Sequence, residues 1–136
     1  MTAAGPHRGC VLVVDDEEGI RDTLREVVEM AGCTAVVAAN GAEALRLLAE
    51  TRPCLVILDL LMPVMSGTEL IDAMKRTPDL ATIPIVVSTS APNRAPRGVP
   101  VLPKPIDILA LWEWMRRTCQ CSSATSEVGV TPTPST

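Results

Sequence analysis

Three aspartates come directly after apolar runs that are rich in β-branched residues. Asp15 and Asp16 follow the run 10–14, and Asp59 follows the run 54–58. In an open parallel sheet the carboxyl ends of the strands meet at one crevice, where ligands bind. Carboxylates brought together there repel each other unless a cation joins them, and Mg²⁺ fits because it accepts one or two carboxylates and keeps several waters. The pattern therefore predicts a magnesium site.

A hydroxyl and an ammonium follow two later apolar runs. Thr89 comes after the run 83–88, and Lys104 follows the run 99–102. A lysine and a hydroxyl opposite a metal-bound carboxylate would hold a phosphoryl group, and a carboxylate such as Asp59 can itself be the nucleophile. Each residue alone is more often a helix cap or a solvated charge. The ordered set, with one member after each of four strands, favours phosphoryl chemistry.

The elements that would position these side chains alternate along the chain. Short apolar runs and segments of helical period follow one another, which is typical of βαβ units and an α/β fold with a parallel sheet. The expected strands are 10–14, 34–38, 54–58, 83–88 and 99–102. The expected helices are a segment around 20–28 that ends before Gly32, then 40–50, 66–76 and one that begins near 106.

A fourth helix is missing from the alternation. Residues 90–98 contain two prolines and few apolar residues, which favours a loop with at most one turn. In the last helix Ile108, Leu111, Trp112, Met115 and Cys119 share one face. Trp114 falls off this face, where it either contacts a partner or lies flat on the domain's own surface.

Length and composition limit the protein class. The 136 residues fit one domain, 47% of them are hydrophobic, and the net charge of −4 gives no basic footprint for nucleic acid. No apolar stretch has the length of a membrane span and no secretory signal is evident, which predicts a cytoplasmic protein. We expect an N-terminal extension at 1–8, one domain at 9–119 and a disordered tail at 120–136, where Ser, Thr and Pro predominate.

The cysteines do not suggest a metal site. There are five, they form no CxxC pair, and the chain has one histidine, so zinc binding is not expected. Three lie in or beside apolar runs, where cysteine behaves as a small hydrophobic residue. We expect buried spectator thiols, and a redox role only for Cys119 and Cys121 near the tail.

The combined motifs resemble those of a known family. Residues 13–17 (VVDDE) are similar to the acidic pair of response regulator receiver domains, and 59–67 (DLLMPVMSG) resembles the segment around their phosphorylated aspartate. Residues 84–90 resemble their fourth strand with its switch threonine, and 104–105 their Lys-Pro dipeptide. The resemblance covers about residues 9–119. It implies a flavodoxin-like, doubly wound sheet of order 2-1-3-4-5 with the fourth helix shortened or absent.

The resemblance also implies roles. Asp59 would be the phosphoacceptor, and Asp15, Asp16, Asp59 and the backbone carbonyl of Leu61 would hold Mg²⁺. Thr89 and Lys104 would contact the phosphoryl group, and the Lys104–Pro105 bond would be cis. The phosphate donor would be a histidine kinase or a histidine phosphotransfer domain. The downstream target is not indicated, a homodimer stays open, and neither nucleic acid nor a membrane is an expected partner.

Three departures from the family are visible. Val101 stands where relatives usually carry an aromatic residue, so a ring that changes rotamer is missing. A shortened fourth helix would leave neighbouring apolar surface exposed for another chain to cover. No output domain is expected in the tail, so the protein would act by docking, by passing phosphate onward or by serving as a phosphate sink.

Three functions fit these residues. The first is a stand-alone receiver in which phosphorylation of Asp59 regulates docking or phosphotransfer. The second is a degenerate receiver that serves as a phosphorylation-independent scaffold, motivated by the missing aromatic residue and helix. The third is a metal-dependent phosphotransferase or phosphatase that acts on another substrate, but phosphatases with an aspartate nucleophile resemble D-x-D, and Leu61 occupies the position of the acid. We expect the first, which is not an enzyme beyond its own phosphorylation and dephosphorylation.

Overall fold

Five parallel strands form one sheet in the computed structural model, which describes residues 9–62 and 64–119. The order β2-β1-β3-β4-β5 is the one that the resemblance implies. The expected N-terminal extension and tail lie outside the described residues. The strands are β1 (Cys10–Val14), β2 (Thr34–Ala38), β3 (Leu55–Asp59), β4 (Ile85–Thr89) and β5 (Val101–Pro103).

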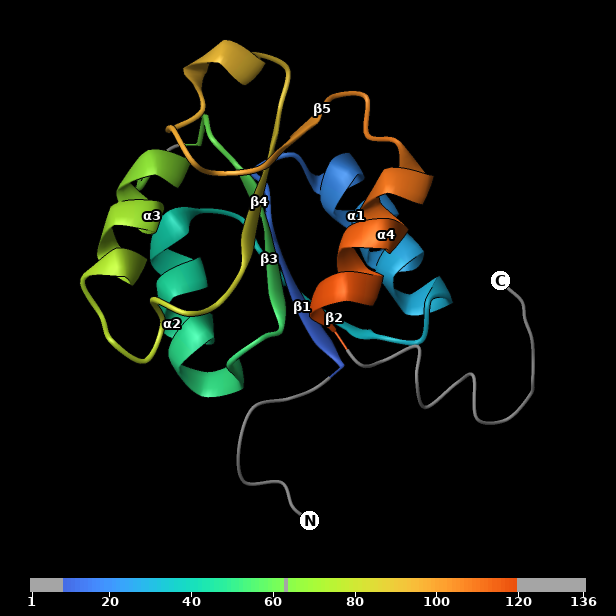
Figure 1. The fold of residues 1–136 in the computed structure, drawn as a ribbon, viewed down its shortest axis with the longest axis horizontal. Coiled ribbons are helices and arrows are strands. Elements are labelled where there is room, and N and C mark those ends of the chain that lie inside the picture. Colours follow the sequence, from blue (N-terminus) through green and yellow to red (C-terminus); the bar gives the residue numbers. More distant parts are fainter. Residues whose placement is uncertain (1–8, 63, 120–136) are drawn as a thin grey trace.

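Helices cover both faces of the sheet. Helices α1 (Glu18–Met30) and α4 (Ile108–Thr118) lie on one face, and α2 (Gly41–Thr51) and α3 (Gly67–Lys75) lie on the other (Figure 1). The predicted α/β fold is confirmed. The expected start of the fourth strand at residue 83 is wrong, because Pro84 has no N–H and contributes to the ladder only as the acceptor of the Val56 N–H.

The strand alternation divides the core into two clusters. Val11, Val13 and Ile57 pack with α1 and α4, whereas Leu12 and Leu58 pack with α2 and α3. Because side chains alternate with a period of two, Asp15 and Asp59 continue the set that faces α1 and α4. The alternation of side chains along β1 and β3 therefore determines which face of the sheet the carboxylate after each strand lies on.

Helix caps support the loops that follow the strands. Asn40 accepts a hydrogen bond from the Glu43 N–H at the start of α2, and Asp107 accepts from the first turn of α4. Ser66 and Glu69 form the expected capping box at the start of α3. These caps satisfy amide groups that would otherwise lack partners. Helices α2 and α3 begin within a residue of the expected starts, and α4 begins at Ile108, two residues after the expected start near 106.

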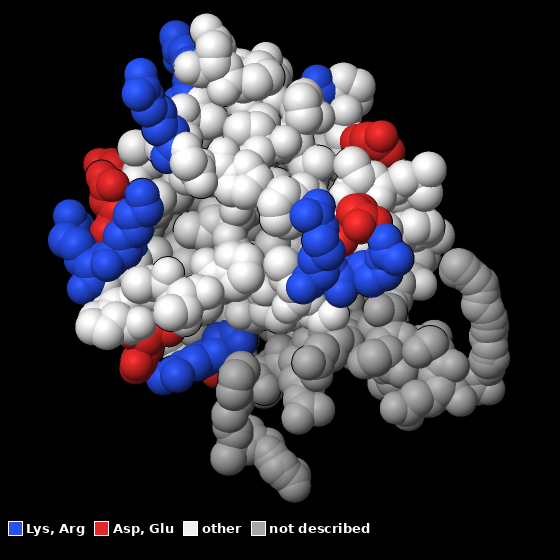
Figure 2. Space-filling view, in the orientation of Figure 1, with Lys and Arg blue, Asp and Glu red and all other residues white. Residues whose placement is uncertain are grey.

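The fourth helix is replaced by the 3₁₀ turn η1 (Pro92–Arg94), which confirms the expected shortening. Part of the apolar surface that a shortened helix was expected to expose is covered in this region. Ala95 and Val99 fold back and pack with Ile83 and Ile85 against the core on the α2 and α3 side. Figure 2, viewed with β4 and β5 in front, shows a largely uncharged surface between charged side chains on the left and right.

The cysteines depart from expectation. Cys54, just before β3, and Cys119, just after α4, form a disulfide with their Cα atoms 5.3 Å apart. Sequence spacing could not indicate this pair, because 65 residues separate the two cysteines and only the fold brings them together. Among the described cysteines, Cys10 is a free, buried thiol. Cys121 lies outside the described residues.

The two tryptophans anchor α4 to the domain. Trp112 donates from Nε1 to the Val27 carbonyl oxygen at 3.1 Å. Trp114 is half-buried against the same core cluster, and the Arg117 guanidinium lies 4.6 Å from its ring centroid. Trp114 thus lies on the domain's own surface. None of the helices in the described part of the chain is both long and apolar enough to cross a membrane.

Candidate functional site

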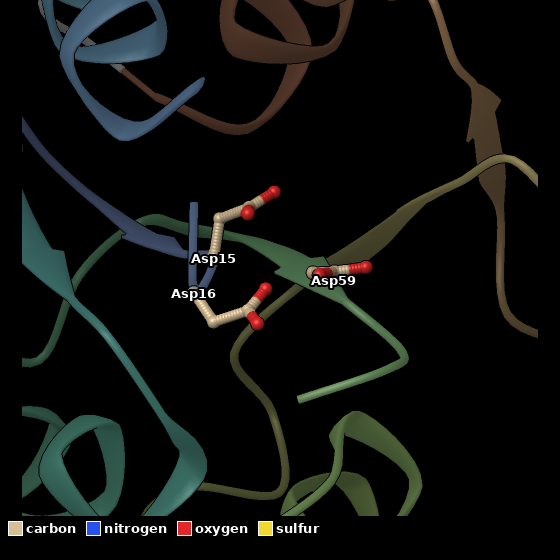
Figure 3. A group of neighbouring side chains, drawn as sticks. All are labelled: Asp15, Asp16 and Asp59. Atoms are coloured by element: carbon tan, nitrogen blue, oxygen red, sulfur yellow. The ribbon is translucent and has the colours of Figure 1, made fainter. Parts of the chain in front are cut away.

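The three predicted aspartates meet at the carboxyl edge of the sheet. Asp15 and Asp16 extend from the end of β1, and Asp59 is the last residue of β3 (Figure 3). One carboxylate oxygen from each lies within 4.8 Å of the others. Asp15 and Asp59 are buried, whereas Asp16 is exposed. The strand order places β1 beside β3, so the adjacency follows from the topology.

Lys104 reaches the same cluster from the loop after β5. Its Nζ lies 3.2 Å from Asp15 Oδ2 and 3.7 Å from Asp59 Oδ1. The Lys104 N–H donates to the Thr89 carbonyl oxygen at 2.9 Å, which continues the pairing of β4 with β5. The Lys104–Pro105 bond is cis, as the resemblance implies. The lysine thus bridges the two buried carboxylates.

Two further hydrogen bonds order Asp15. The Glu17 N–H donates to Asp15 Oδ1 at 2.9 Å, and Arg21 donates from its guanidinium to the Asp15 carbonyl oxygen at 2.9 Å. The first contact holds the Asp15 side chain, and the second holds its backbone, in the turn between β1 and α1. Glu17 was quoted only within the motif 13–17, and Arg21 was not predicted, because its side chain reads as an ordinary solvated charge of an amphipathic helix.

The remaining predicted residues border the cluster. Thr89 is buried at the end of β4, and its Oγ1 accepts from the Ala91 N–H at 3.0 Å. The Leu61 N–H lies 3.4 Å from Asp59 Oδ1, which keeps this backbone at the site, while the Leu61 side chain is exposed. The structure therefore brings Asp15, Asp16, Asp59 and Lys104 into one group, with Thr89 and Leu61 at its edge.

Comparison with known proteins identifies the family. The family model of the response regulator receiver domain matches residues 11–108. The chain belongs to the response regulator receiver family. Its relatives include an uncharacterized 14.6 kDa protein of Leptolyngbya boryana, 35% identical over 80% of this chain and 88% of that protein. Response regulator MprA of Mycobacterium sp. strain KMS is 34% identical over 78% of this chain, which spans about half of that relative's length (48%).

Solved structures agree with this assignment. Chemotaxis protein CheY4 of Vibrio cholerae has a TM-score of 0.72 and 28% identity, covering 82% of this chain and 99% of that one. The signal receiver domain of a histidine kinase from Syntrophus aciditrophicus has a TM-score of 0.73 and 30% identity, covering 92% and 98%. The chain is therefore a receiver domain of two-component signalling.

The electrostatics of this receiver favour a cation beside Asp59. Burial, and next the charge of Asp15, raise the pKa of Asp59 to about 6 although Lys104 opposes the shift. Burial alone would lower the pKa of Lys104, but the hydrogen bond and charge of Asp15 outweigh it and the pKa is raised. Three carboxylates facing one ammonium leave an excess of negative charge, and an all-oxygen donor set suits a hard cation. The residues therefore fit Mg²⁺.

The receiver's β3–α3 loop is held tightly against the site. A Cβ at Gly67 would lie 2.4 Å from the Asp59 carbonyl oxygen and 2.8 Å from Leu60 Cα, so only glycine fits this close approach. Val64 in the same loop has a φ of 70°, which is unusual for a β-branched residue. Both features arise because the chain makes a tight turn between Asp59 and the start of α3.

One hydroxyl at the site was not predicted. Ser88 lies directly beside Asp59 in the β3–β4 register and is buried. Its Oγ has no hydrogen-bond partner among the described residues. A register argument could have found it, since the residue before the switch threonine pairs with the last residue of β3 once the two strands are aligned.

Proposed function

We propose that this receiver takes a phosphoryl group onto Asp59 in a Mg²⁺-dependent reaction and signals by that modification. The observation that carries the proposal is the group formed by Asp15, Asp59 and Lys104, in which one ammonium lies 3.2 Å and 3.7 Å from two buried carboxylates. A buried nucleophile next to a fixed positive charge is suited to phosphoryl transfer, where positioning and charge stabilisation provide most of the catalysis.

The transfer can be written with the residues at hand. An Asp59 carboxylate oxygen attacks the phosphorus of the donor, the bond from phosphorus to the donor's leaving atom breaks, and its electron pair stays on that atom. Lys104 offsets the charge of the transferred group. Thr89 Oγ1 accepts from the Ala91 N–H, which leaves its own proton for a phosphoryl oxygen. Bound Mg²⁺, held by Asp15, Asp16, Asp59 and the Leu61 carbonyl, would supply further positive charge.

We also propose the partners of the receiver and the compartment in which it works. The donor would be a histidine kinase or a histidine phosphotransfer domain, with phosphohistidine as the leaving group, and the downstream target would be a protein. The receiver would work in the cytoplasm, where such kinases have access to ATP. It would turn over no external substrate and would catalyse only its own phosphorylation and dephosphorylation, because no second acid stands two residues after Asp59.

The test is phosphate incorporation from acetyl phosphate, followed by intact-protein mass with and without Mg²⁺. Wild type is compared with Asp59→Asn, and Asp72→Asn serves as the matched control because Asp72 is an exposed carboxylate on α3. We expect Mg²⁺-dependent addition of one phosphoryl group in wild type and in Asp72→Asn, and none in Asp59→Asn. The fluorescence of Trp112 and Trp114 is recorded in parallel.

The outcomes separate the candidate functions. Absence of labelling in wild type, or equal labelling of Asp59→Asn, would contradict the proposed phosphoacceptor. Labelling of Asp59 without any change in tryptophan fluorescence or in partner binding would favour the phosphorylation-independent scaffold. Labelling with a spectral change would support a switch that α4 reports, since Trp112 is hydrogen-bonded to α1.

A further inference from the structure

The amino-terminal edge of the sheet carries a second chemical group, opposite the aspartates. Cys54 precedes β3, Cys119 follows α4, and Cys10 begins β1. The disulfide between Cys54 and Cys119 attaches the last turn of α4 to the strand whose other end is Asp59. The bond therefore covalently joins two elements that both lead to the phosphoryl site, because α4 follows the Lys104 loop.

The attachment matters because the other contacts that hold the end of α4 are noncovalent. Leu111 and Met115 are buried beneath it, and the indole of Trp112 donates to Val27. The last turn itself carries Arg116, Arg117 and Thr118, of which both arginines are exposed. Cys119 is the residue after this turn and is buried in the core cluster, and its bond to Cys54 adds a covalent link between the turn and β3.

The surroundings accommodate both oxidation states. Cys54 Sγ lies 3.1 Å from the Cys10 carbonyl oxygen, so after reduction the Cys54 thiol can donate a hydrogen bond to that oxygen. Cys119 Sγ lies 3.7 Å from Thr118 Oγ1, a second polar partner for a thiol. Two reduced thiols would thus be left with partners rather than stranded in an apolar core.

We propose that Cys54–Cys119 is a reversible thiol–disulfide site, through which a dithiol reductant controls how firmly the end of α4 is held to β3. Cys54 is half-buried whereas Cys119 is 6% exposed, so Cys54 Sγ is the sulfur that a reductant reaches. That such a bond is a sensor rather than a permanent link rests on the proposed cytoplasmic setting, where thiols are kept reduced and lasting disulfides are rare.

The exchange balances with a dithiol as the only co-reactant. One thiolate of the reductant attacks Cys54 Sγ, the protein S–S bond breaks, and its electron pair leaves on Cys119 Sγ, which takes up a proton. The reductant's second thiolate then attacks its own sulfur in the mixed disulfide and releases Cys54, which is protonated. The protein gains two electrons and two protons, and the dithiol becomes a disulfide.

The test uses the full chain with dithiothreitol as the dithiol. Alkylation of folded protein followed by peptide mapping shows whether Cys54 and Cys119 are protected before reduction and modified after it. Hydrogen exchange is then measured over residues 113–118. We expect exchange there to rise roughly tenfold or more on reduction, and the Tm to fall by about 10 °C, because a long closed loop is opened.

Cys33 is also disulfide-bonded, so dithiothreitol can reduce more than the Cys54–Cys119 bond, and two variants assign the response to its source. Cys119→Ser should exchange rapidly in α4 with or without dithiothreitol, while Cys10→Ala should respond like wild type, because Cys10 is a buried thiol outside the bond. A full response that persists in Cys119→Ser would overturn the proposal. So would alkylation of both cysteines before reduction, or a bond that dithiothreitol opens only in unfolded protein.

If Cys119→Ser fails to fold, the alkylation pattern of wild type before and after reduction still shows whether the Cys54–Cys119 bond opens in the folded protein. None of these measurements involves phosphate. A failure of the redox site is therefore distinguishable from a failure of Asp59 phosphorylation, because the first is tested by alkylation and hydrogen exchange and the second by acetyl phosphate labelling.

Discussion

The two ends of the sheet are built in opposite ways. At the carboxyl end, Asp15, Asp59 and Lys104 bring buried charges together around a space lined with oxygen atoms. At the amino end, Cys10, Cys54 and Cys119 are small and uncharged, and a covalent bond joins two elements there. The same strand, β3, has Cys54 immediately before it and Asp59 as its last residue.

The difference indicates where the fold gains and loses stability. Buried like charges and a strained loop lower the stability of the carboxyl end, and such features persist where the surrounding structure determines them. Apolar packing and a cross-link that closes a long loop raise the stability of the amino end. Substitutions at the site should therefore fall into two groups, those that remove a compensating contact and those that remove a source of strain.

Removing the bridging ammonium should have the largest effect. In Lys104→Met, the carboxylates of Asp15 and Asp59 stay buried without their partner, and breaking a buried pair in this way typically costs about 3–5 kcal/mol. We expect this loss in urea unfolding at pH 8 without metal, together with a loss of acetyl phosphate labelling. Lys75→Met, at an exposed position on α3, is the control and should unfold like wild type. Equal stability of the two variants would contradict the charge argument.

Filling the close approach behind Asp59 should come next. The Cβ of Gly67→Ala would overlap backbone atoms of Asp59 and Leu60, which cannot move aside as a flexible side chain could. Overpacking of this kind costs about 2–3 kcal/mol. Gly19→Ala is the matched control, because nothing lies within 4 Å of its added Cβ, and the alanine should stabilise α1 by up to about 1 kcal/mol. Calorimetry of both variants measures the contrast.

Neutralising the phosphoacceptor should instead stabilise the metal-free protein. Because the pKa of Asp59 is raised to about 6 in the folded state, the folded protein binds this proton more tightly than the unfolded chain. The contribution of Asp59 is thus fully present below pH 4 and is lost as the pH rises through 6. We expect Asp59→Asn to be more stable than wild type by about 2 kcal/mol at pH 8, and the gain to vanish near pH 4.

The control variant is Asp72→Asn, which replaces an exposed carboxylate on α3 and leaves Asp15, Asp59 and Lys104 in place. Saturating Mg²⁺ should reduce the advantage of Asp59→Asn, because a bound cation stabilises only the wild-type cluster. An advantage that is the same at pH 4 and pH 8 would show that Asp59 does not titrate in this range.

Local sequence signals predict most of the fold. The strand runs, the capping pairs and the two prolines of 90–98 each act within a few residues, so periodicity and turn chemistry suffice to place them. The aspartates and Lys104 could be grouped because all of them follow strands of a parallel sheet. Strand ends differ from expectation by one or two residues, as at Pro84, because hydrogen-bond partners and not hydrophobicity determine them.

Features that depend on long-range proximity could not be predicted. The bond from Cys54 to Cys119 joins residues that share no local pattern, and the hydroxyl of Ser88 became part of the site only through the register of β3 with β4. The packing of Val99 against the core was also missed, because its place in a short apolar run predicted a strand at 99–102, whereas β5 begins at Val101. Each of these requires knowing which segments pack together.

Relieving loop strain should give the smallest change at the carboxyl end. Val64 has a φ of 70° and is 81% exposed, so its side chain contributes little packing while its backbone occupies the left-handed region. Asparagine tolerates this conformation, and we expect Val64→Asn to raise the unfolding free energy by about 1 kcal/mol. Leu61→Asn separates strain from polarity, because Leu61 is also exposed in this loop but is not among the residues with positive φ. Leu61→Asn should change the unfolding free energy little.

If both variants are equally stabilised, the gain comes from removing exposed apolar surface, and the backbone at Val64 is not a source of strain. Urea unfolding of the two variants beside wild type measures the difference.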